Sequence, residues 1–139
     1  MDDVTLVTTV CERLAAAGVG AWRPVGPPYG AGEVAIHYGA LPASPDRAIG
    51  VTLYVADDEL RTSLAVRRVQ LRVRGARGDA AGADRLASAT FDALQGLART
   101  AGLSLVTRVL VAHLGADENA RQERADSYQI VLDNAEASA

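Results

Sequence analysis

The stretch AVRRVQLRVRG, residues 65 to 75, alternates apolar and polar side chains at every second position. One side of this pattern carries Val69, Leu71 and Val73. The other side carries Arg68, Gln70, Arg72 and Arg74. A period of two predicts a β-strand, because successive side chains of a strand point to opposite faces of the sheet. One buried and one solvated face are typical of an antiparallel sheet, so this stretch predicts the class of the whole fold.

Other hydrophobic patterns supply the remaining elements. Further strands are predicted at residues 34–38, 49–55, 103–114 and 127–133, and the long apolar run at 103–114 is typical of a central strand. Apolar stripes at three- and four-residue spacing predict helices near residues 3–17 and 79–99. The expected fold class is therefore α+β. We expect a mainly antiparallel sheet of about five strands, covered on one face by two helices, in the order α-β-β-β-α-β-β.

Length and composition narrow the class of protein. The 139 residues fit one domain, expected to span residues 1–134, with residues 135–139 as a frayed tail. The net charge of −3 argues against a dedicated nucleic-acid-binding protein, since such domains usually carry a basic excess. Cys11 is the only cysteine and lies on the first apolar stripe, as a core residue would. No secretory signal or membrane span is expected, because no apolar run approaches ~20 residues.

Charge is distributed unevenly along the chain. Six arginines and no acidic residue lie between positions 61 and 78, whereas six acidic residues and two arginines lie between 111 and 139. Surfaces of opposite sign would let one copy of the domain dock onto another, with chance segregation on a solvated surface as the alternative. The candidate subunit-interface residues are Arg68, Arg72, Arg74, Asp117, Glu118, Arg121 and Glu123.

Two segments are predicted to be loops that a partner could contact. Residues 21–34 contain three prolines and three glycines, and so long an irregular connection is often functional. Residues 56–63, ADDELRTS, form the predicted tip of a hairpin. The candidate partner-docking residues in these loops are Trp22, Tyr29, Asp57, Asp58, Glu59 and Arg61. The structural alternatives are a tryptophan that anchors its own loop and a solvated acidic tip.

The sequence assembles no catalytic or metal-binding motif. His37 and His113 have no cysteine beside them, and no serine lies in a Gly-x-Ser-x-Gly motif. We therefore expect no enzymatic activity, no cofactor and no metal. A small monomeric or dimeric ligand-binding module, using the loop around Trp22 and Tyr29, is the alternative function.

Four segments together resemble a known family. They are YGALPASPDRAIGVTLY at residues 38–54, VQLRVRG at 69–75, DAAGADRLASATFDALQGL at 79–97, and LGADENARQERADSYQIVL at 114–132. In their order and spacing they resemble the small tail terminator proteins of long-tailed bacteriophages, also called minor capsid proteins. The resemblance runs from the first predicted helix to the last predicted strand.

The resemblance implies a structural role in the virion. Proteins of this family form a hexameric ring that caps the finished tail tube, stops its polymerisation and presents a surface to the head connector. The implied partners are further copies of the chain, the tail tube protein and the head–tail connector or stopper protein, with no membrane involved. Genomic DNA would pass through the lumen without sequence-specific binding. The implied location is the tail–neck junction, after assembly in the host cytoplasm.

Overall fold

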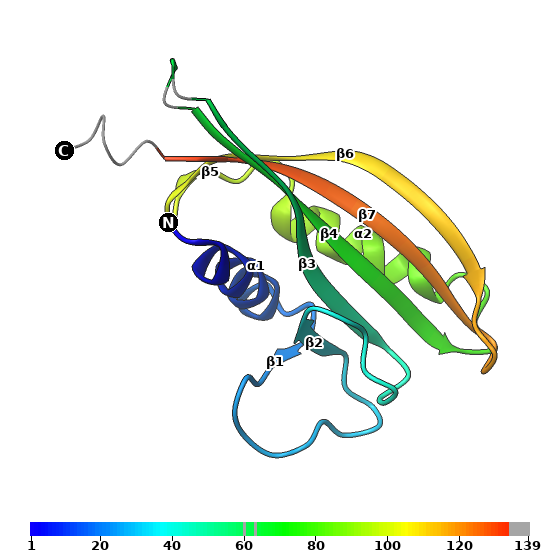
Figure 1. The fold of residues 1–139 in the computed structure, drawn as a ribbon. Coiled ribbons are helices and arrows are strands. Elements are labelled where there is room, and N and C mark those ends of the chain that lie inside the picture. The colour runs from blue at the N-terminus through cyan, green and yellow to red at the C-terminus, as the bar shows by residue number, and fades with distance from the viewer. Residues whose placement is uncertain (60, 63, 134–139) are drawn as a thin grey trace.

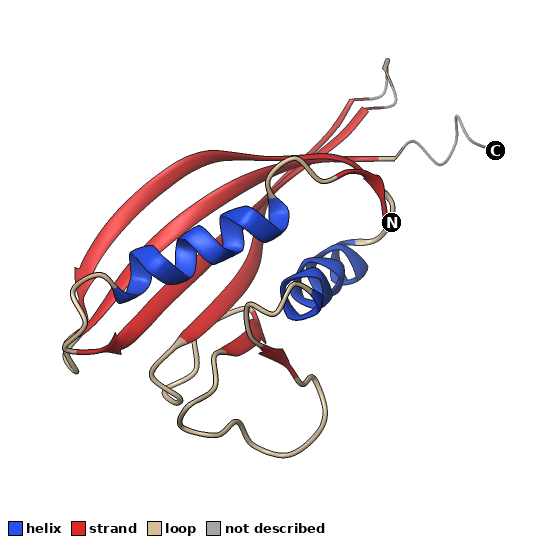
Figure 2. Ribbon diagram, turned by 180° about the vertical axis from the view of Figure 1, so that it is seen from behind, coloured by secondary structure: helices blue, strands red, loops and turns tan. Residues whose placement is uncertain are grey.

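The computed structural model describes residues 1–59, 61–62 and 64–133, so the predicted tail at 135–139 lies outside the described residues. These residues form one curved sheet of seven strands with two helices on one face (Figures 1 and 2). In spatial order the strands are β1 (Ala21–Trp22), β2 (Ala35–Tyr38), β3 (Ala48–Glu59), β4 (Leu64–Arg77), β7 (Arg121–Leu132), β6 (Leu103–Ala116) and β5 (Ala98–Thr100). The pairs β1–β2 and β2–β3 are parallel, and the remaining pairs are antiparallel.

The predicted five-strand, mainly antiparallel sheet is therefore wrong. The sheet has seven strands and is mixed, and the order along the chain is α-β-β-β-β-α-β-β-β. The two strands that were missed, β1 and β5, have two and three residues. Two or three residues are too few to reveal the alternation of apolar and polar side chains that identifies a strand. The pairs β1–β2 and β2–β3 are parallel because a long connection returns the chain to the same end of the sheet before each new strand. The hydrophobic pattern of a single strand does not reveal the path of such a connection.

The charged segments that lay outside the predicted strands are mostly strand. β6 continues to Ala116 and β7 begins at Arg121, so only residues 117–120 form the turn between them. Likewise β3 continues through the acidic residues to Glu59. Charged residues can form part of these strands because the two hairpins extend beyond the protein core. Main-chain pairing between their strands continues there.

The first helix, α1 (Asp3–Ala16), follows its prediction closely. The Asp2 carboxylate accepts a hydrogen bond from the Thr5 backbone N–H at 2.7 Å, which caps the helix. Its buried stripe consists of Leu6, Val7, Val10, Cys11 and Leu14. No helix among the described residues is long and apolar enough to cross a membrane.

The second helix, α2 (Gly82–Leu94), is shorter than the predicted 79–99. It ends because Gln95 adopts an extended conformation and Gly96 has a φ of 79°. At the N-terminal end of α2, the N-cap residue is Ala81 and not Asp79. No side chain forms a capping hydrogen bond there. Residues beyond the helix instead begin the short strand β5.

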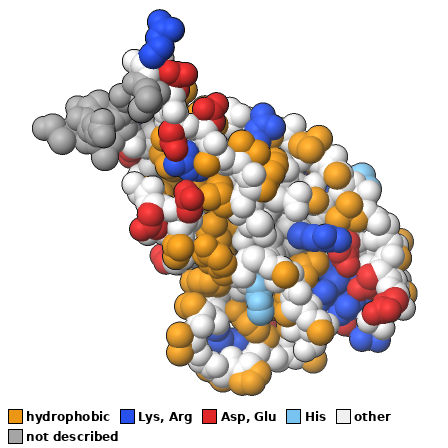
Figure 3. Space-filling view, viewed as in Figure 1, with side chains coloured by type: hydrophobic (Ala, Val, Ile, Leu, Met, Phe, Trp, Pro, Cys, Tyr) orange, Lys and Arg blue, Asp and Glu red, His pale blue; other side chains and the backbone are white. Residues whose placement is uncertain are grey.

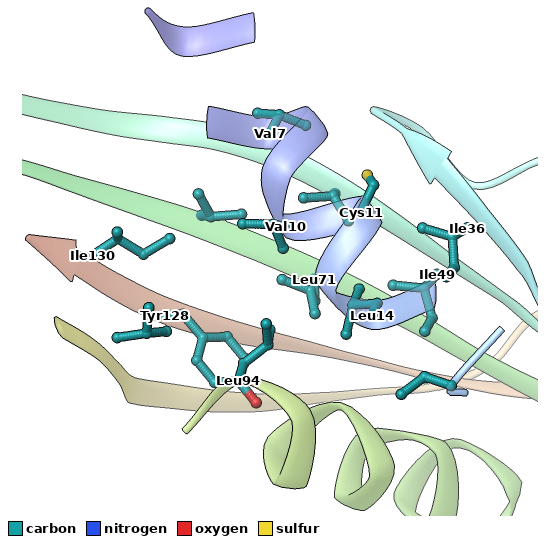
Figure 4. Close-up of a cluster of buried hydrophobic side chains, with 14 of the residues drawn as sticks. Val7, Val10, Cys11, Leu14, Ile36, Ile49, Leu71, Leu94, Tyr128 and Ile130 are labelled. Carbon is teal, nitrogen blue, oxygen red and sulfur yellow. The ribbon is translucent and has the colours of Figure 1, made fainter. Parts of the chain in front are cut away.

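The core lies between the helices and the apolar face of the sheet. Val69, Leu71 and Val73 of β4 are fully buried, as their alternation predicted. Figure 4 shows α1 side chains above Leu71, with Tyr128 of β7 extending toward α2. Burial raises the pKa of the Cys11 thiol to about 12, which keeps it protonated and fits the predicted core role.

A glycine in β3 allows a connecting segment to cross the other face of the sheet. A Cβ atom at Gly50 would lie 2.4 Å from the Gly39 carbonyl oxygen and 3.2 Å from the Leu41 backbone nitrogen. Backbone atoms cannot yield as a flexible side chain can. We therefore expect Gly50→Ala to lower the free energy of unfolding by about 1–3 kcal/mol. Chemical denaturation would measure this, with Gly32→Ala as control because its Cβ would meet nothing within 4 Å.

Candidate assembly surfaces

The helix-free face of the sheet carries two of the predicted interface arginines. The Nε atom of Arg72 donates to the Glu123 carboxylate at 3.0 Å, from β4 to β7. The Arg72 side chain is 51% exposed, whereas that of Glu123 is 13% exposed. Arg68 reaches Gln129 on the same face at 3.4 Å. Arg72 is therefore held from one side only and presents half of its surface to solvent.

The third arginine of the pattern, Arg74, is placed differently. It is only 3% exposed and donates to the backbone carbonyls of Asp46 at 2.7 Å and Pro45 at 2.8 Å. Burial, together with the nearby positive charge of Arg121, lowers the pKa of the Arg74 guanidinium. Arg74 thus anchors the connection between β2 and β3 within its own subunit.

Arg121 joins the same connection to the turn between β6 and β7. Its side chain donates to Asp117 at 2.8 Å, to the Ala43 carbonyl at 2.9 Å and to Asp46 at 3.3 Å. Asp117 also accepts the backbone N–H groups of Asn119 and Arg121, both at 2.9 Å. Hydrogen bonds from Arg77 and then Arg121 hold the pKa of the Asp46 carboxyl below its usual value.

Among the predicted acidic residues, Glu118 differs from Asp117 and Glu123. Glu118 is exposed at the turn, and the described residues offer it no ion pair. Asp117 and Glu123 each have an arginine partner in their own chain. Whether any of these residues also contacts a neighbouring subunit stays a prediction.

Two charged groups on the helix-covered face were missed by the sequence analysis. Arg67 is 8% exposed and pairs with Asp58 at 2.7 Å and with Asp3 at 3.3 Å. The second group centres on Asp126, which is fully buried and accepts two hydrogen bonds of 2.8 Å from Arg124.

The Arg124 group also ties β7 to the helix. Arg124 reaches Asp84 of α2 at 3.0 Å, and Arg108 of β6 lies over the Phe91 ring at 4.2 Å. The signal was available, because extending the alternation of Tyr128 backward places Arg124 and Asp126 on the same face. Both were missed because the predicted strand began only at residue 127.

The irregular loop after β1 is anchored to the protein body by aromatic residues. The Tyr29 hydroxyl donates to the Ile36 carbonyl at 3.0 Å and accepts the Arg23 backbone N–H at 2.9 Å. The Arg23 guanidinium lies 4.9 Å from the Tyr29 ring centre and forms an ion pair with Glu33. Trp22 and Tyr29 also line an open hollow of about 330 Å³.

The hairpin between β3 and β4 extends away from the body (Figure 1). Asp57, Asp58, Glu59 and Arg61 are all exposed there. Asp58 is held by Arg67, and the Glu59 carboxylate accepts the Arg61 backbone N–H at 3.0 Å. Among the described residues, no three His, Cys, Asp or Glu side chains are grouped as a metal site would require.

Exposed apolar side chains concentrate on the outer strands. Those of β6 are Leu105, Val109, Leu110, Val111 and Leu114. Figure 3 shows apolar side chains along the β6 side of the sheet and a cluster of mixed charge near the turn between β6 and β7. The surface therefore combines an apolar edge with a charged corner.

Comparison with known proteins assigns the chain to a family. The family model described as "Bacteriophage tail terminator protein" matches residues 13–134. The chain belongs to this tail terminator family. The match confirms the resemblance deduced from the sequence and gives the protein a structural role in the phage tail.

A solved structure supports the fold of this tail terminator. A chain of the "Virion of native gene transfer agent (GTA) particle" is similar with a TM-score of 0.52 and 20% sequence identity. The similarity covers 70% of this chain and 78% of that chain. At this identity the likeness shows the fold alone. No curated protein matches the sequence.

Arg121 is buried and Arg72 is exposed, and the effect of replacing each on the free energy of unfolding can be compared. Arg121→Met removes a buried guanidinium and leaves Asp117 and Asp46 without it, so we expect the free energy of unfolding to fall by about 2–3 kcal/mol. Arg72→Met removes an exposed ion pair and should cost less than about 1 kcal/mol. Chemical denaturation of both variants checks the order. Equal costs would contradict the structural role assigned to Arg121.

Proposed function

We propose that this protein terminates the phage tail as a ring of about six subunits. The ring caps the tail tube, stops its polymerisation and joins it to the head connector. The family match over residues 13–134 carries the proposal. The number six is what the resemblance described under the sequence analysis implies. In this proposal the ring assembles in the host cytoplasm and lies at the tail–neck junction of the virion, where DNA passes through its lumen.

The geometry of the subunit supports a ring. Closed rings of identical subunits require heterologous contacts, in which two different surfaces of the same chain meet. This sheet has different strands at its two sides, with β6 and the short β5 on one side and β3 with the short β1 and β2 on the other. A contact between unlike sides leads from one subunit to the next, and it gives a ring when the rotation between neighbours closes.

Charge pairing between subunits would set the register of that contact. Of the residues predicted for the interface, Arg72 and Glu118 are the most accessible, because Arg74, Arg121, Asp117 and Glu123 are engaged within the subunit. We assign the inter-subunit pairing to these two residues, and Arg68 lies on the same face of the sheet as Arg72. Exposed pairs contribute only about 0–1 kcal/mol each, so apolar contacts must supply most of the affinity.

The two exposed loops are proposed to dock the other tail components. The hollow beside Trp22 and Tyr29 has room for an apolar side chain of the tube or connector protein. The projecting hairpin carries Asp57, Asp58, Glu59 and Arg61. It would contact whichever of the tube and connector proteins does not occupy the hollow. The same hollow is the observation that favours the alternative, a ligand-binding module.

The assembly of tails in the presence and absence of the protein tests the proposal. Tail tubes assembled without the chain should continue beyond their normal length, and addition of the purified chain should stop them and leave a ring on the end. Electron microscopy of the tubes measures both. Normal tube length in the absence of the protein would refute termination. A ligand-binding module would leave tube length unchanged and remain monomeric or dimeric in solution.

The proposed charge pair can be tested by reversal. Arg72→Glu should reduce ring assembly, because it places a new carboxylate against those of Glu118 and Glu123, and adding Glu118→Arg should restore part of the loss. Arg85→Glu, an exposed change on α2, is the control. Light scattering of the assembled ring measures the effect. If Arg72→Glu assembles like the control, Arg72 lies on a solvated face and the charge pairing is wrong.

A further inference from the structure

The outer edge of β6 is open over most of its length. β5 pairs with β6 only as far as Leu105, and the next hydrogen bonds join Val106 to Gly96 and Leu97. The backbone N–H of Arg108 then donates to the Gln95 side chain at 2.7 Å. From residue 109 to residue 116, this edge has no further main-chain partner among the described residues.

This open edge has two register shifts, between Arg108 and Leu110 and between His113 and Gly115, but it lacks the side chains that normally prevent strand pairing. Its sequence, VLVAHLGA, contains no proline, lysine, arginine or acidic residue. Natural sheets protect their edges with such residues, because an exposed row of N–H and C=O groups pairs with any available strand. Leu110 is 57% exposed and Leu114 is 46% exposed on the same stretch. An edge of this kind favours pairing with another strand.

The opposite side of the sheet has an open edge of similar length. β2 pairs with β3 only through residues 48–51, and the Gly39 backbone N–H then donates to the Val51 carbonyl. From residue 52 to residue 59, the outer edge of β3 has no main-chain partner among the described residues. Tyr54 and Val55 are exposed there, at 45% and 38%.

We propose that the open edge of β6 in one subunit pairs with the open edge of β3 in the next subunit. The inference rests on the ring proposed above and adds which edges close it. Directions are compatible, because β3, β4, β7 and β6 are successive antiparallel neighbours, so β6 runs opposite to β3. A neighbour related by rotation presents its β3 antiparallel to β6, and the sheet continues from subunit to subunit.

The stagger of the two open edges fits a closed sheet. Val51 and Val111 share one row of the subunit, through Leu71 and Asp126. Aligning like faces of the two open edges places Val111 opposite Ala56 of the neighbour, because both residues lie on the helix-covered face, beside Asp126 and Arg67. Ala56 lies four positions from Val51 when counted along β4, since a register shift between Leu53 and Val55 adds a residue to β3. This shift is about 14 Å along the strands, over four strands that span about 19 Å. The strands would then tilt by about 35° from the ring axis, at the lower end of the 35–45° typical of closed sheets.

The same register brings opposite charges together. β6 would run past Thr52 of the neighbour, so the turn at 117–120 would reach the neighbour's residues 39–41 and Arg72. Those residues line an open hollow of about 390 Å³ on the helix-free face. Exposed Glu118 would enter this hollow from the adjoining subunit. Main-chain pairing and charge complementarity therefore favour the same neighbour in the same orientation.

Cysteine cross-linking tests the pairing directly. Ala112 and Val55 lie on the helix-free face, and the proposed register places them opposite each other. A chain with both Val55→Cys and Ala112→Cys should form a ladder of covalent oligomers under mild oxidation, up to the size of the ring. Each single variant should remain uncross-linked, and Cys11 is buried and should not react. Dimers from Ala112→Cys alone would indicate two-fold pairing of β6 with itself and overturn the proposal.

A charge placed on the edge gives a second measurement. Leu110→Lys should weaken assembly by about tenfold or more, because it removes an apolar side chain from the interface and charges the edge. Val4→Lys on α1, where Val4 is 62% exposed, is the matched control. Analytical ultracentrifugation would measure assembly, and circular dichroism would verify that each variant is folded. Equal assembly of the two folded variants would overturn the edge pairing.

The outcomes separate this inference from the proposed function. If rings form and stop tubes at normal length while the double-cysteine ladder is absent, the ring stands and the edge pairing is wrong. If the unmodified chain fails to stop tubes, the terminator function itself fails. A ladder together with normal termination supports both.

Discussion

The fold depends on the separation of an apolar face and a charged face on the strand β4. One face carries Val69, Leu71 and Val73 into a core shared with both helices, and the other carries Arg68 and Arg72. A shift of one residue in register would place arginines in the core and valines in water. The ladders to β3 and β7 fix that register over nearly the whole length of β4. The helices, the buried charges and the exposed edges are all positioned relative to this strand.

Sequence patterns predicted the elements that are long and repetitive. Helix α1 and strand β4 have enough residues for their periods to emerge, and both are found close to where they were expected. The strands β1 and β5 depend on neighbours that are distant in the chain, so no local pattern marks them. The parallel pairing of β2 with β3 is likewise a property of the connection between them and not of either strand.

The arginines show why the candidate site was only partly predictable. Arg72 and Arg74 occupy equivalent positions in the same alternation, yet one is half exposed and the other is 3% exposed. The difference comes from Pro45 and Asp46, whose backbone carbonyls accept the hydrogen bonds of Arg74 from almost thirty positions away. Gly50 permits this crossing because its missing Cβ leaves room for residues 39–41. Alternation gives the face on which a side chain lies, but tertiary contacts decide whether solvent reaches that face.

The strand β6 is the most informative disagreement between sequence and structure. Its apolar run is typical of a central strand, and we expected one, but in the folded subunit half of it lies at an edge with exposed leucines and valines. A central-strand sequence at an edge is costly for an isolated subunit, since it exposes apolar surface and unpaired main-chain groups together. That cost disappears if the strand becomes central on assembly. In the proposed ring another strand lies beside β6, so its central-strand sequence would match the assembled state and the isolated subunit would be an incomplete sheet.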